Sequence, residues 1–306
     1  MDELLITIAI PTYNNEATIG NTITSCLNQD TEIPYEVLVV NNASTDKTKE
    51  MIEVHKNDKI KYVENDHTVT LYENHNACLD HASGRYVLFC HSDDRLESHA
   101  VETFARKLRE RNFPKKYIIF GHSMFTDSAI HVHCGGFYLN EMIVGEYAPL
   151  MFMNSGVTPS GTCYSKDSLM ELGGFLRTEH WLAAGDMTSM LYCAMKGFRF
   201  EMIDEMIFDR TYASTAVVGR KMTDRLDAID EAFEHFYKVV NENDIRNLLR
   251  ISSKLKRAPL SFYHAIAKYP SYKKEMAALL FKEVLKNPFL LRKRVLYSVI
   301  KRLFLS

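Results

Sequence analysis

Residues 86–94 read YVLFCHSDD, and the chemistry of the chain changes abruptly within this stretch. Tyr86 to Cys90 form a short apolar run, which predicts a buried strand. Asp93 and Asp94 then stand side by side, and two adjacent negative charges repel each other unless a cation or water compensates them. A hard divalent ion such as Mg²⁺ or Mn²⁺ takes oxygen ligands and needs only one or two carboxylates. The pair therefore indicates either a metal site or a solvated turn that caps a helix after Leu96.

The chain around this stretch alternates short apolar runs with amphipathic segments. Ile19, Ile23 and Leu27 lie four residues apart, which is the spacing of one helical face. Ser44 is a candidate N-cap for the helix that follows it. The predicted strands are 4–10, 35–40, 60–63, 86–90 and 117–120, and the predicted helices are 16–28, 45–54, 72–81 and 98–111. This alternation predicts an α/β fold with a mainly parallel central sheet.

Three polar loops follow predicted strands, at residues 11–16, 41–46 and 91–94. The carboxyl ends of parallel strands meet at one edge of a sheet, so these loops are expected to converge on a ligand site. The Tyr13 ring is suited to stacking on the nucleobase of a nucleotide, and the Asn42 side chain is suited to pairing with the edge of that nucleobase. Each of these residues taken alone is equally typical of an ordinary turn.

Composition narrows the class of protein. The chain has 306 residues, 46% of them hydrophobic, and a formal net charge of −2, which gives no reason to expect a nucleic-acid partner. Its six cysteines include no CxxC pair, which argues against a zinc knuckle or a disulfide framework and favours a reduced, cytoplasmic setting. The acidic start and the absence of an apolar run of about 20 residues predict no signal peptide and no membrane span.

The C-terminal third differs in character. After Lys221 the chain carries long segments rich in Lys, Glu and Leu, which predict a helical appendage over 221–306. Residues 289–306 interleave five basic residues with apolar ones and contain no acidic residue. Such a helix either contacts an anionic membrane surface from the cytoplasmic side or packs on the protein with a solvated basic face.

Taken together, the loop motifs resemble the family-2 glycosyltransferases with a GT-A fold. The close resemblance covers about the first hundred residues, and weaker matches occur at 165–175, at Asp186 and at 210–214. Order and spacing both agree. The segments that carry it are Ile8-Ala9-Ile10-Pro11-Thr12-Tyr13-Asn14-Asn15-Glu16, Val39-Val40-Asn41-Asn42-Ala43-Ser44-Thr45-Asp46-Lys47-Thr48, and Ala82-Ser83-Gly84-Arg85-Tyr86-Val87 leading to Ser92-Asp93-Asp94.

The resemblance implies a Rossmann-like GT-A domain over 1–220, with a nucleotide-binding half at 1–97 and an acceptor-binding half at 98–220. It also implies a nucleotide-sugar donor, a Mn²⁺ or Mg²⁺ ion held by Asp94 with Asp93, and Asp93 close to the ribose. The expected donor-binding residues are Pro11, Thr12, Tyr13, Glu16, Asn42, His75, Ser92, Asp93 and Arg210. His75 stands where relatives often carry Arg, so it is expected to make a pH-dependent phosphate contact.

Asp186 matches the catalytic base of the family, which sits before a helix near the acceptor. An Asp at that place is also an ordinary helix N-cap. The sequence departs from the family pattern at Gly185, Asn41, His91 and Tyr212, where relatives carry Glu, an acid, an acid and His. With His91 in place of an acid, the site is expected to hold its metal mainly through Asp94 and the donor diphosphate. His180 and Trp181 are candidates for the acceptor pocket or for the core.

The predicted function is that of an inverting, metal-dependent glycosyltransferase. It would move a sugar from a UDP-linked donor to a hydroxyl of a glycan or lipid-linked glycan in surface-polysaccharide assembly. The alternative is a catalytically impaired relative that binds a nucleotide-sugar or a partner, which the three lost acids favour. Nucleotidyltransferases share the sheet architecture, but their Gly-rich, basic first loop is absent at 11–16.

Overall fold

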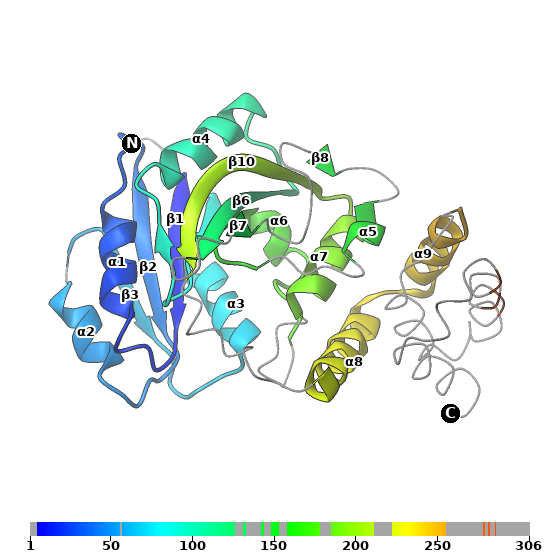
Figure 1. Ribbon diagram of the computed structural model, residues 1–306, viewed down its shortest axis with the longest axis horizontal. Helices are drawn as coiled ribbons and strands as arrows, with labels where there is room; N and C mark the ends of the chain where they lie inside the picture. The colour runs from blue at the N-terminus through cyan, green and yellow to red at the C-terminus, as the bar shows by residue number, and fades with distance from the viewer. Residues whose placement is uncertain are drawn as a thin grey trace.

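The computed structural model describes residues 5–55, 57–125, 131–132, 142–143, 148–152, 158–177, 185–210 and 222–254, with 278, 281 and 285 also described (Figure 1). Within these ranges the chain forms one mixed sheet with helices around it. Residues 289–306, which carry the predicted membrane contact, lie outside the described residues, as do His180, Trp181 and Tyr212. No helix in the described part of the chain is long and apolar enough to cross a membrane.

The strands form one sheet in the order β3-β2-β1-β4-β9-β6-β10-β5, with β7 paired to β6 and β8 to β10. The strands are β1 (Ile6–Thr12), β2 (Tyr35–Asn41), β3 (Ile60–Glu64), β4 (Tyr86–Phe89), β5 (Arg95–Leu96), β6 (Tyr117–Phe125), β7 (His131–Val132), β8 (Met142–Ile143), β9 (Thr162–Ser165) and β10 (Arg199–Arg210). Strands β3, β2, β1 and β4 are all parallel, as the alternating pattern predicted. Their carboxyl ends therefore lie at the same edge.

The second half of the sheet is joined to the first by β9. This strand is antiparallel both to β4 and to β6, with Cys163 opposite Leu88 on one side and Ile119 on the other. Beyond it, β6 and β10 are again parallel, and their pairing is interrupted by two register shifts in β10. The sheet is thus two parallel groups of strands linked by one short antiparallel strand.

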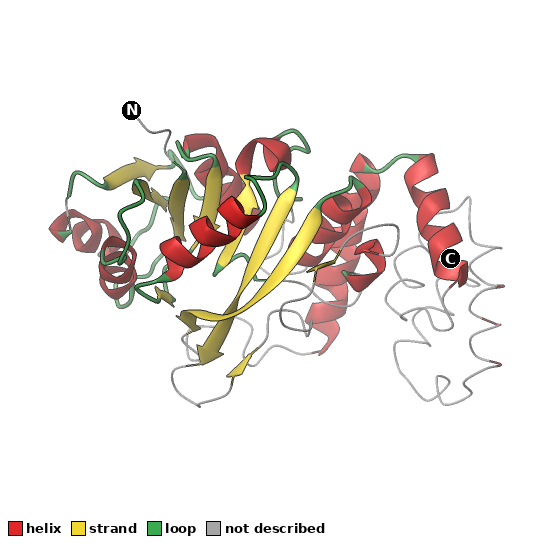
Figure 2. Ribbon diagram, turned by 90° about the horizontal axis from the view of Figure 1, so that it is seen from above, coloured by secondary structure: helices red, strands yellow, loops and turns green. Residues whose placement is uncertain are grey.

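Nine helices accompany the sheet in the described ranges: α1 (Ile19–Leu27), α2 (Thr48–Val54), α3 (Leu71–His81), α4 (Ala100–Glu110), α5 (Ala148–Met151), α6 (Lys166–Met170), α7 (Gly185–Met195), α8 (Met222–Val239) and α9 (Glu242–Lys254). Helix α3 packs on β1 and β2, and α7 packs on α5 and α8. Figures 1 and 2 show α8 and α9 on the far side of the molecule from the N-terminal strands. The helical character predicted after Lys221 is therefore seen as far as Lys254.

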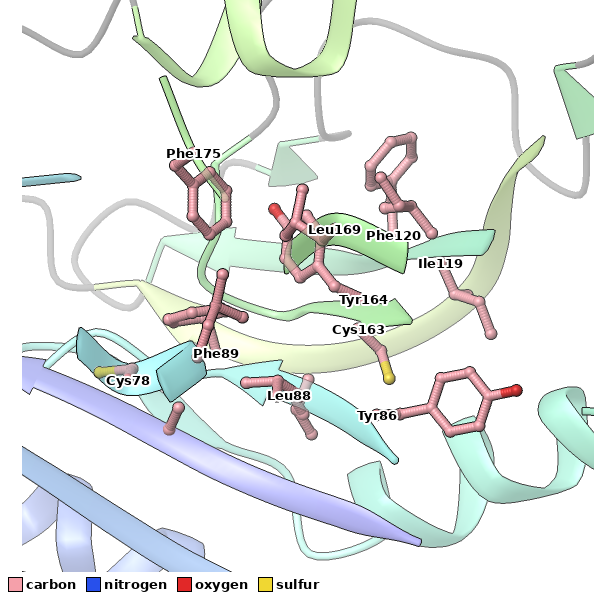
Figure 3. Close-up of a cluster of buried hydrophobic side chains, with 14 of the residues drawn as sticks. Cys78, Tyr86, Leu88, Phe89, Ile119, Phe120, Cys163, Tyr164, Leu169 and Phe175 are labelled. Carbon is pink, nitrogen blue, oxygen red and sulfur yellow. The ribbon is translucent and has the colours of Figure 1, made fainter. Parts of the chain in front are cut away.

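An aromatic cluster holds the two halves of the sheet together beneath the loop at 91–94 (Figure 3). Phe89 on β4 lies 5.7 Å from Tyr164 on β9 and 5.6 Å from Phe175, measured between ring centroids. All three side chains are fully buried, and their edge-to-face arrangement is the one aromatic quadrupoles favour. The end of β4 is therefore fixed by packing, which fixes the start of the loop after it.

Several expected boundaries were wrong by a few residues. Strand β1 does not close at Pro11 but continues to Thr12, because its ladder with β4 has already ended at Ala9 and the missing N–H of proline removes no bond there. Ser44 is not an N-cap, since α2 begins at Thr48 and Lys47 occupies the N-cap position. The turn at Asp93-Asp94 does not cap a helix either. It leads into β5, and α4 begins only at Ala100.

Candidate active site

The loop after β4 is a tight turn fixed from three sides. Asp94 N–H donates to the carbonyl of His91 at 2.9 Å, which closes the turn. The hydroxyl of Thr22 on α1 donates to the Asp94 carbonyl at 2.8 Å, and His91 N–H donates to the hydroxyl of Ser160 at 3.0 Å. The backbone of the loop is thus bonded to both halves of the molecule. Its side chains have a defined direction.

Three potential metal ligands meet in this loop. A carboxylate oxygen of Asp93, a carboxylate oxygen of Asp94 and a ring nitrogen of His91 all lie within 4.8 Å of one another. Asp94 is 4% exposed, whereas Asp93 and His91 are partly exposed. Two carboxylates and one imidazole fit a divalent ion that accepts both oxygen and nitrogen, with room left for water or phosphate oxygens. His91, expected as a lost ligand, therefore lies among the candidate ligands.

His75 meets the loop through the ring of His91, and both of its ring nitrogens face protein groups. It is 1% exposed on α3, where its Nδ1 lies 2.8 Å from the Leu71 carbonyl and its Nε2 lies 3.1 Å from Nε2 of His91. Burial, with His91 as a second cause, lowers the pKa of His75 to about 3. Burial, with Arg210 as a second cause, lowers the pKa of His91 to about 3 as well. Both rings are therefore neutral at physiological pH, and His75 has no charge to offer a phosphate.

The loop after β1 is tied to the two neighbouring loops. Asn14 has a left-handed backbone (φ 51°), and its side-chain oxygen accepts from Thr45 N–H at 2.8 Å. The carboxylate of Glu16 accepts from Lys47 N–H at 2.9 Å, so Glu16 holds the start of α2. The hydroxyl of Ser92 donates to the Asn15 side chain at 2.8 Å. The predicted convergence of the three loops is confirmed, and hydrogen bonds between them maintain it.

Asn42 connects the loop after β2 to the segment before α3. Its amide nitrogen donates to the Val69 carbonyl at 2.9 Å, and its amide oxygen accepts from Val69 N–H at 2.9 Å and from the Asn65 side chain at 3.0 Å. The residue is 3% exposed. These hydrogen bonds fix the segment before α3, and the contact of Asn42 with a nucleobase edge stays a prediction.

The nucleobase of the donor was expected at the carboxyl end of β1, where Pro11, Thr12 and Tyr13 lie. Pro11 and Thr12 are buried and Tyr13 is partly exposed. The Thr12 hydroxyl is buried without a hydrogen-bond partner among the described residues. Buried hydroxyls normally have a partner, so this one marks the rim as a place suited to a polar ligand.

Asp186 lies in the first turn of α7 and is only 9% exposed. Its carboxylate accepts from Met187 N–H at 2.6 Å, and its own N–H donates to the hydroxyl of Tyr72 at 2.8 Å. Burial raises the pKa of Asp186 to about 7, against the opposing effects of these backbone N–H groups and of Arg210. A carboxylate with such a pKa can take up a proton near neutral pH, which is what a general base requires.

The ring of Tyr72 explains why position 185 is a glycine. A Cβ atom on Gly185 would lie 2.4 Å from the Tyr72 ring, a distance that real Cβ atoms do not show. Any side chain at position 185 would therefore overlap the ring. The acid that the family pattern implies before Asp186 has no room here while Tyr72 stands on α3.

Arg210 is the last residue of β10. Its positive charge contributes to the lowered pKa of His91 and counteracts the raised pKa of Asp186, so its guanidinium is electrostatically close to both. Arg210, Asp186 and the loop at 91–94 are therefore assembled at one end of the sheet. The contacts of His75 with His91, and of Tyr72 with Asp186, were not predicted. Their one sequence signal was the three-residue spacing of Tyr72 and His75 on a helical face.

Comparisons with known proteins identify the family. The family model described as glycosyl transferase family 2 matches residues 7–206. Among curated proteins, the chain is 32% identical over 117 residues to the UDP-Glc:alpha-D-GlcNAc-diphosphoundecaprenol beta-1,3-glucosyltransferase WfgD of Escherichia coli, covering 38% of this chain and 46% of that protein. It is 30% identical over 174 residues to the poly(ribitol-phosphate) beta-N-acetylglucosaminyltransferase TarS of Staphylococcus aureus, covering 53% of this chain and 30% of that protein. The matches thus span less than half the length of these two relatives.

Solved structures show the same fold. Residues 1–349 of S. aureus TarS in complex with UDP-GlcNAc superpose with a TM-score of 0.64 at 17% identity, covering 98% of this chain and 82% of that one. The complex of the same fragment with UDP gives a TM-score of 0.61 at 18% identity, covering 87% of this chain and 82% of that one. At these identities the likeness establishes the architecture, which is that of GT-A glycosyltransferases.

Proposed function

The chain belongs to glycosyl transferase family 2, and on that premise we propose that it transfers a sugar from a UDP-sugar to a hydroxyl of a glycan or lipid-linked glycan. The observation that carries this proposal is the assembly of Asp93 and Asp94 with Asp186 and Arg210 at one end of the sheet. A nucleotide-sugar needs a cation beside its diphosphate and a base beside the attacking hydroxyl. Asp93 and Asp94 are suited to holding the cation, and Asp186 is suited to acting as the base.

The donor is proposed to lie across the carboxyl ends of β1 and β4. Pro11, Thr12 and Tyr13 would border the base, and Asp93 would lie near the ribose. A Mn²⁺ or Mg²⁺ ion held by Asp94 and Asp93 would, when bound, offset the negative charge on the departing diphosphate. Arg210 supplies a second positive charge at the same place, and a guanidinium binds phosphate oxygens in a defined geometry.

Asp186 is proposed as the base of a direct, inverting displacement. It would accept the proton of the acceptor hydroxyl as that oxygen bonds to C1 of the sugar and the nucleoside diphosphate leaves. Burial favours this role, because a pKa of about 7 makes the carboxylate a stronger base than an exposed Asp. No covalent intermediate is needed, since one nucleophile replaces one leaving group.

The names of the relatives support the substrate class. WfgD is named for UDP-glucose and a diphosphoundecaprenol-linked acceptor, and TarS has been solved with UDP and UDP-GlcNAc. A lipid-linked acceptor would also give the basic segment 289–306 a membrane surface to contact. That contact stays a prediction from the sequence.

The proposal is tested with Asp186→Asn, Asp94→Asn and the matched control Asp167→Asn, whose side chain is 81% exposed on α6. Thermal shift with UDP and other nucleoside diphosphates, with and without Mn²⁺, first identifies the donor base. Transfer from the corresponding sugar nucleotides is then measured. Asp186→Asn is expected to bind donor normally and to lose about 10²- to 10⁴-fold in turnover.

Asp94→Asn is expected to lose the Mn²⁺-dependent part of the thermal shift, and Asp167→Asn to behave as the wild type. A folded Asp186→Asn protein with undiminished transfer would remove Asp186 as the base. Donor binding without turnover across a broad acceptor panel would instead favour the non-catalytic alternative.

A further inference from the structure

His75, which is buried, and His91, which is partly exposed, form a pair whose hydrogen bonds determine the tautomer of each ring. The Leu71 carbonyl can only accept, so His75 Nδ1, 2.8 Å away, must carry the proton. In a neutral ring the other nitrogen then has a lone pair, so His75 Nε2 is an acceptor. His91 Nε2 lies 3.1 Å from it and must therefore be the donor.

This chain of hydrogen bonds leaves the lone pair of His91 on Nδ1. Within the described residues Nδ1 makes no hydrogen bond, while one ring nitrogen of His91 lies within 4.8 Å of oxygens of Asp93 and Asp94. A metal ion binds the unprotonated nitrogen of an imidazole, whose other N–H is normally held by an acceptor. Here the acceptor is the imidazole of His75.

The ring of His75 is itself held in place. It stacks on Phe89 with centroids 5.2 Å apart and meets the edge of Phe175 at 5.7 Å. The ring of His91 stands nearly perpendicular to it, at 88° and 5.2 Å. His75 therefore cannot turn away without disturbing the aromatic cluster beneath the loop, and it holds His91 in one orientation.

We propose that His75 is a positioning residue that keeps His91 in the Nε2–H tautomer. His91 Nδ1 then joins Asp93 and Asp94 in a mixed nitrogen and oxygen site. This site takes Mn²⁺ in preference to Mg²⁺. Mg²⁺ strongly prefers oxygen ligands in a strict octahedron, whereas imidazole suits transition metals. A site in which a ring nitrogen replaces a third carboxylate oxygen thus favours Mn²⁺. The inference deepens the proposed function, because the same loop faces the proposed donor diphosphate.

The test is a titration of the full chain with Mn²⁺ alone, followed by electron paramagnetic resonance, with Mg²⁺ as competitor. Pulsed measurements on the bound Mn²⁺ are expected to show ¹⁴N modulation from a directly bound imidazole. His91→Asp is expected to abolish the ¹⁴N modulation and to narrow the preference for Mn²⁺ over Mg²⁺. Bound Mn²⁺ without ¹⁴N modulation in the wild type would overturn the proposal.

The role of His75 is tested separately. His75→Leu removes the acceptor and is expected to weaken Mn²⁺ binding about 10- to 100-fold. His75→Gln places an amide oxygen near the former Nε2 and is expected to restore most of the affinity. His81→Gln, on the exposed end of the same helix, is the control and should leave binding unchanged. A folded His75→Leu protein with wild-type affinity and ¹⁴N modulation would show that His75 does not position His91.

Neither measurement uses a nucleotide or a sugar. Nitrogen-bound Mn²⁺ in a protein that transfers no sugar would keep this inference and reject the proposed function. Sugar transfer by a protein whose Mn²⁺ has no nitrogen ligand would keep the proposed function and reject this inference.

Discussion

Single residues in this site acquire their properties from neighbours that are distant in the sequence. Asp186 was predicted as a base from its place before a helix, but its raised pKa comes from burial beside Tyr72, which precedes it by more than a hundred residues. His75 was predicted to contact phosphate, yet both of its ring nitrogens face protein groups. Sequence motifs indicate which residues lie at a site. They do not indicate which groups within the protein already occupy each donor and acceptor.

The raised pKa of Asp186 predicts a stability that depends on pH. Below about pH 4 the carboxyl is protonated in both states, and between about 4 and 7 the folded protein keeps a proton that the unfolded chain has lost. The contribution of this group to the free energy of unfolding is therefore fully present at low pH and is lost as pH rises through about 7. Its size is on the order of 2 to 4 kcal/mol.

The measurement is urea unfolding of the wild type and Asp186→Asn from pH 4 to 8. The free energy of unfolding of the wild type relative to the variant is expected to fall across this range, because Asn does not titrate. A difference that stays constant with pH would contradict the assigned pKa.

At the level of helices and strands, the sequence predicted the elements well and their starts less well. Helix α1 was expected from residue 16 but begins at Ile19, because the Asn15 carbonyl accepts from Thr18 N–H and Ile19 N–H in a preceding turn. Helix α2 also starts late, since the carboxylate of Glu16 accepts from Lys47 N–H and the carboxylate of Asp46 accepts from the N–H of Thr48, its first residue. Apolar periodicity detects the buried face of a helix. It does not detect loop side chains that compete for the first backbone groups.

The hydrogen bonds between the Asn42 side chain and the Val69 backbone lead to a prediction about stability. Asn42→Ala would leave the N–H and C=O of Val69 without their partner in a partly buried setting, at a cost of about 1 to 3 kcal/mol. The segment before α3 should then be cut faster by protease, and the melting temperature should fall. Asn21→Ala, at an exposed position of α1, is the control and should change stability by no more than about 0.5 kcal/mol. Equal stability of the two variants would show that the Asn42 amide is not structurally important.

Across the whole molecule, the mixed character of the sheet was the part that sequence patterns could not supply. The parallel order of the first four strands follows from alternation of strands and helices. The position of β9 does not, because it has four residues and pairs with strands formed more than 40 and 70 residues earlier. Short strands carry little periodicity, and their partners are determined by packing such as that of Phe89 with Tyr164.

The junction at β9 predicts the behaviour of a shortened chain. A fragment of residues 1–115 contains β3, β2, β1 and β4 but leaves the hydrogen-bonding edge of β4 uncovered, and Phe89 loses its contacts with Tyr164 and Phe175. An open apolar edge pairs with other chains. The fragment is expected to form oligomers or aggregates in size-exclusion chromatography with light scattering, whereas residues 1–254 should remain dispersed. A monomeric, folded fragment would contradict this account of the junction.

The contact of Gly185 with Tyr72 constrains the order in which this sequence can change over time. A substitution that introduced an acid at position 185 while Tyr72 remained would force a side chain into the ring, and the variant would lose stability before it could gain any catalytic benefit. Replacement of Tyr72 by a smaller residue must therefore come first, and it would remove the hydroxyl that accepts from Asp186 N–H. The two positions are linked by epistasis across α3 and α7, and an acid at position 185 requires both to change.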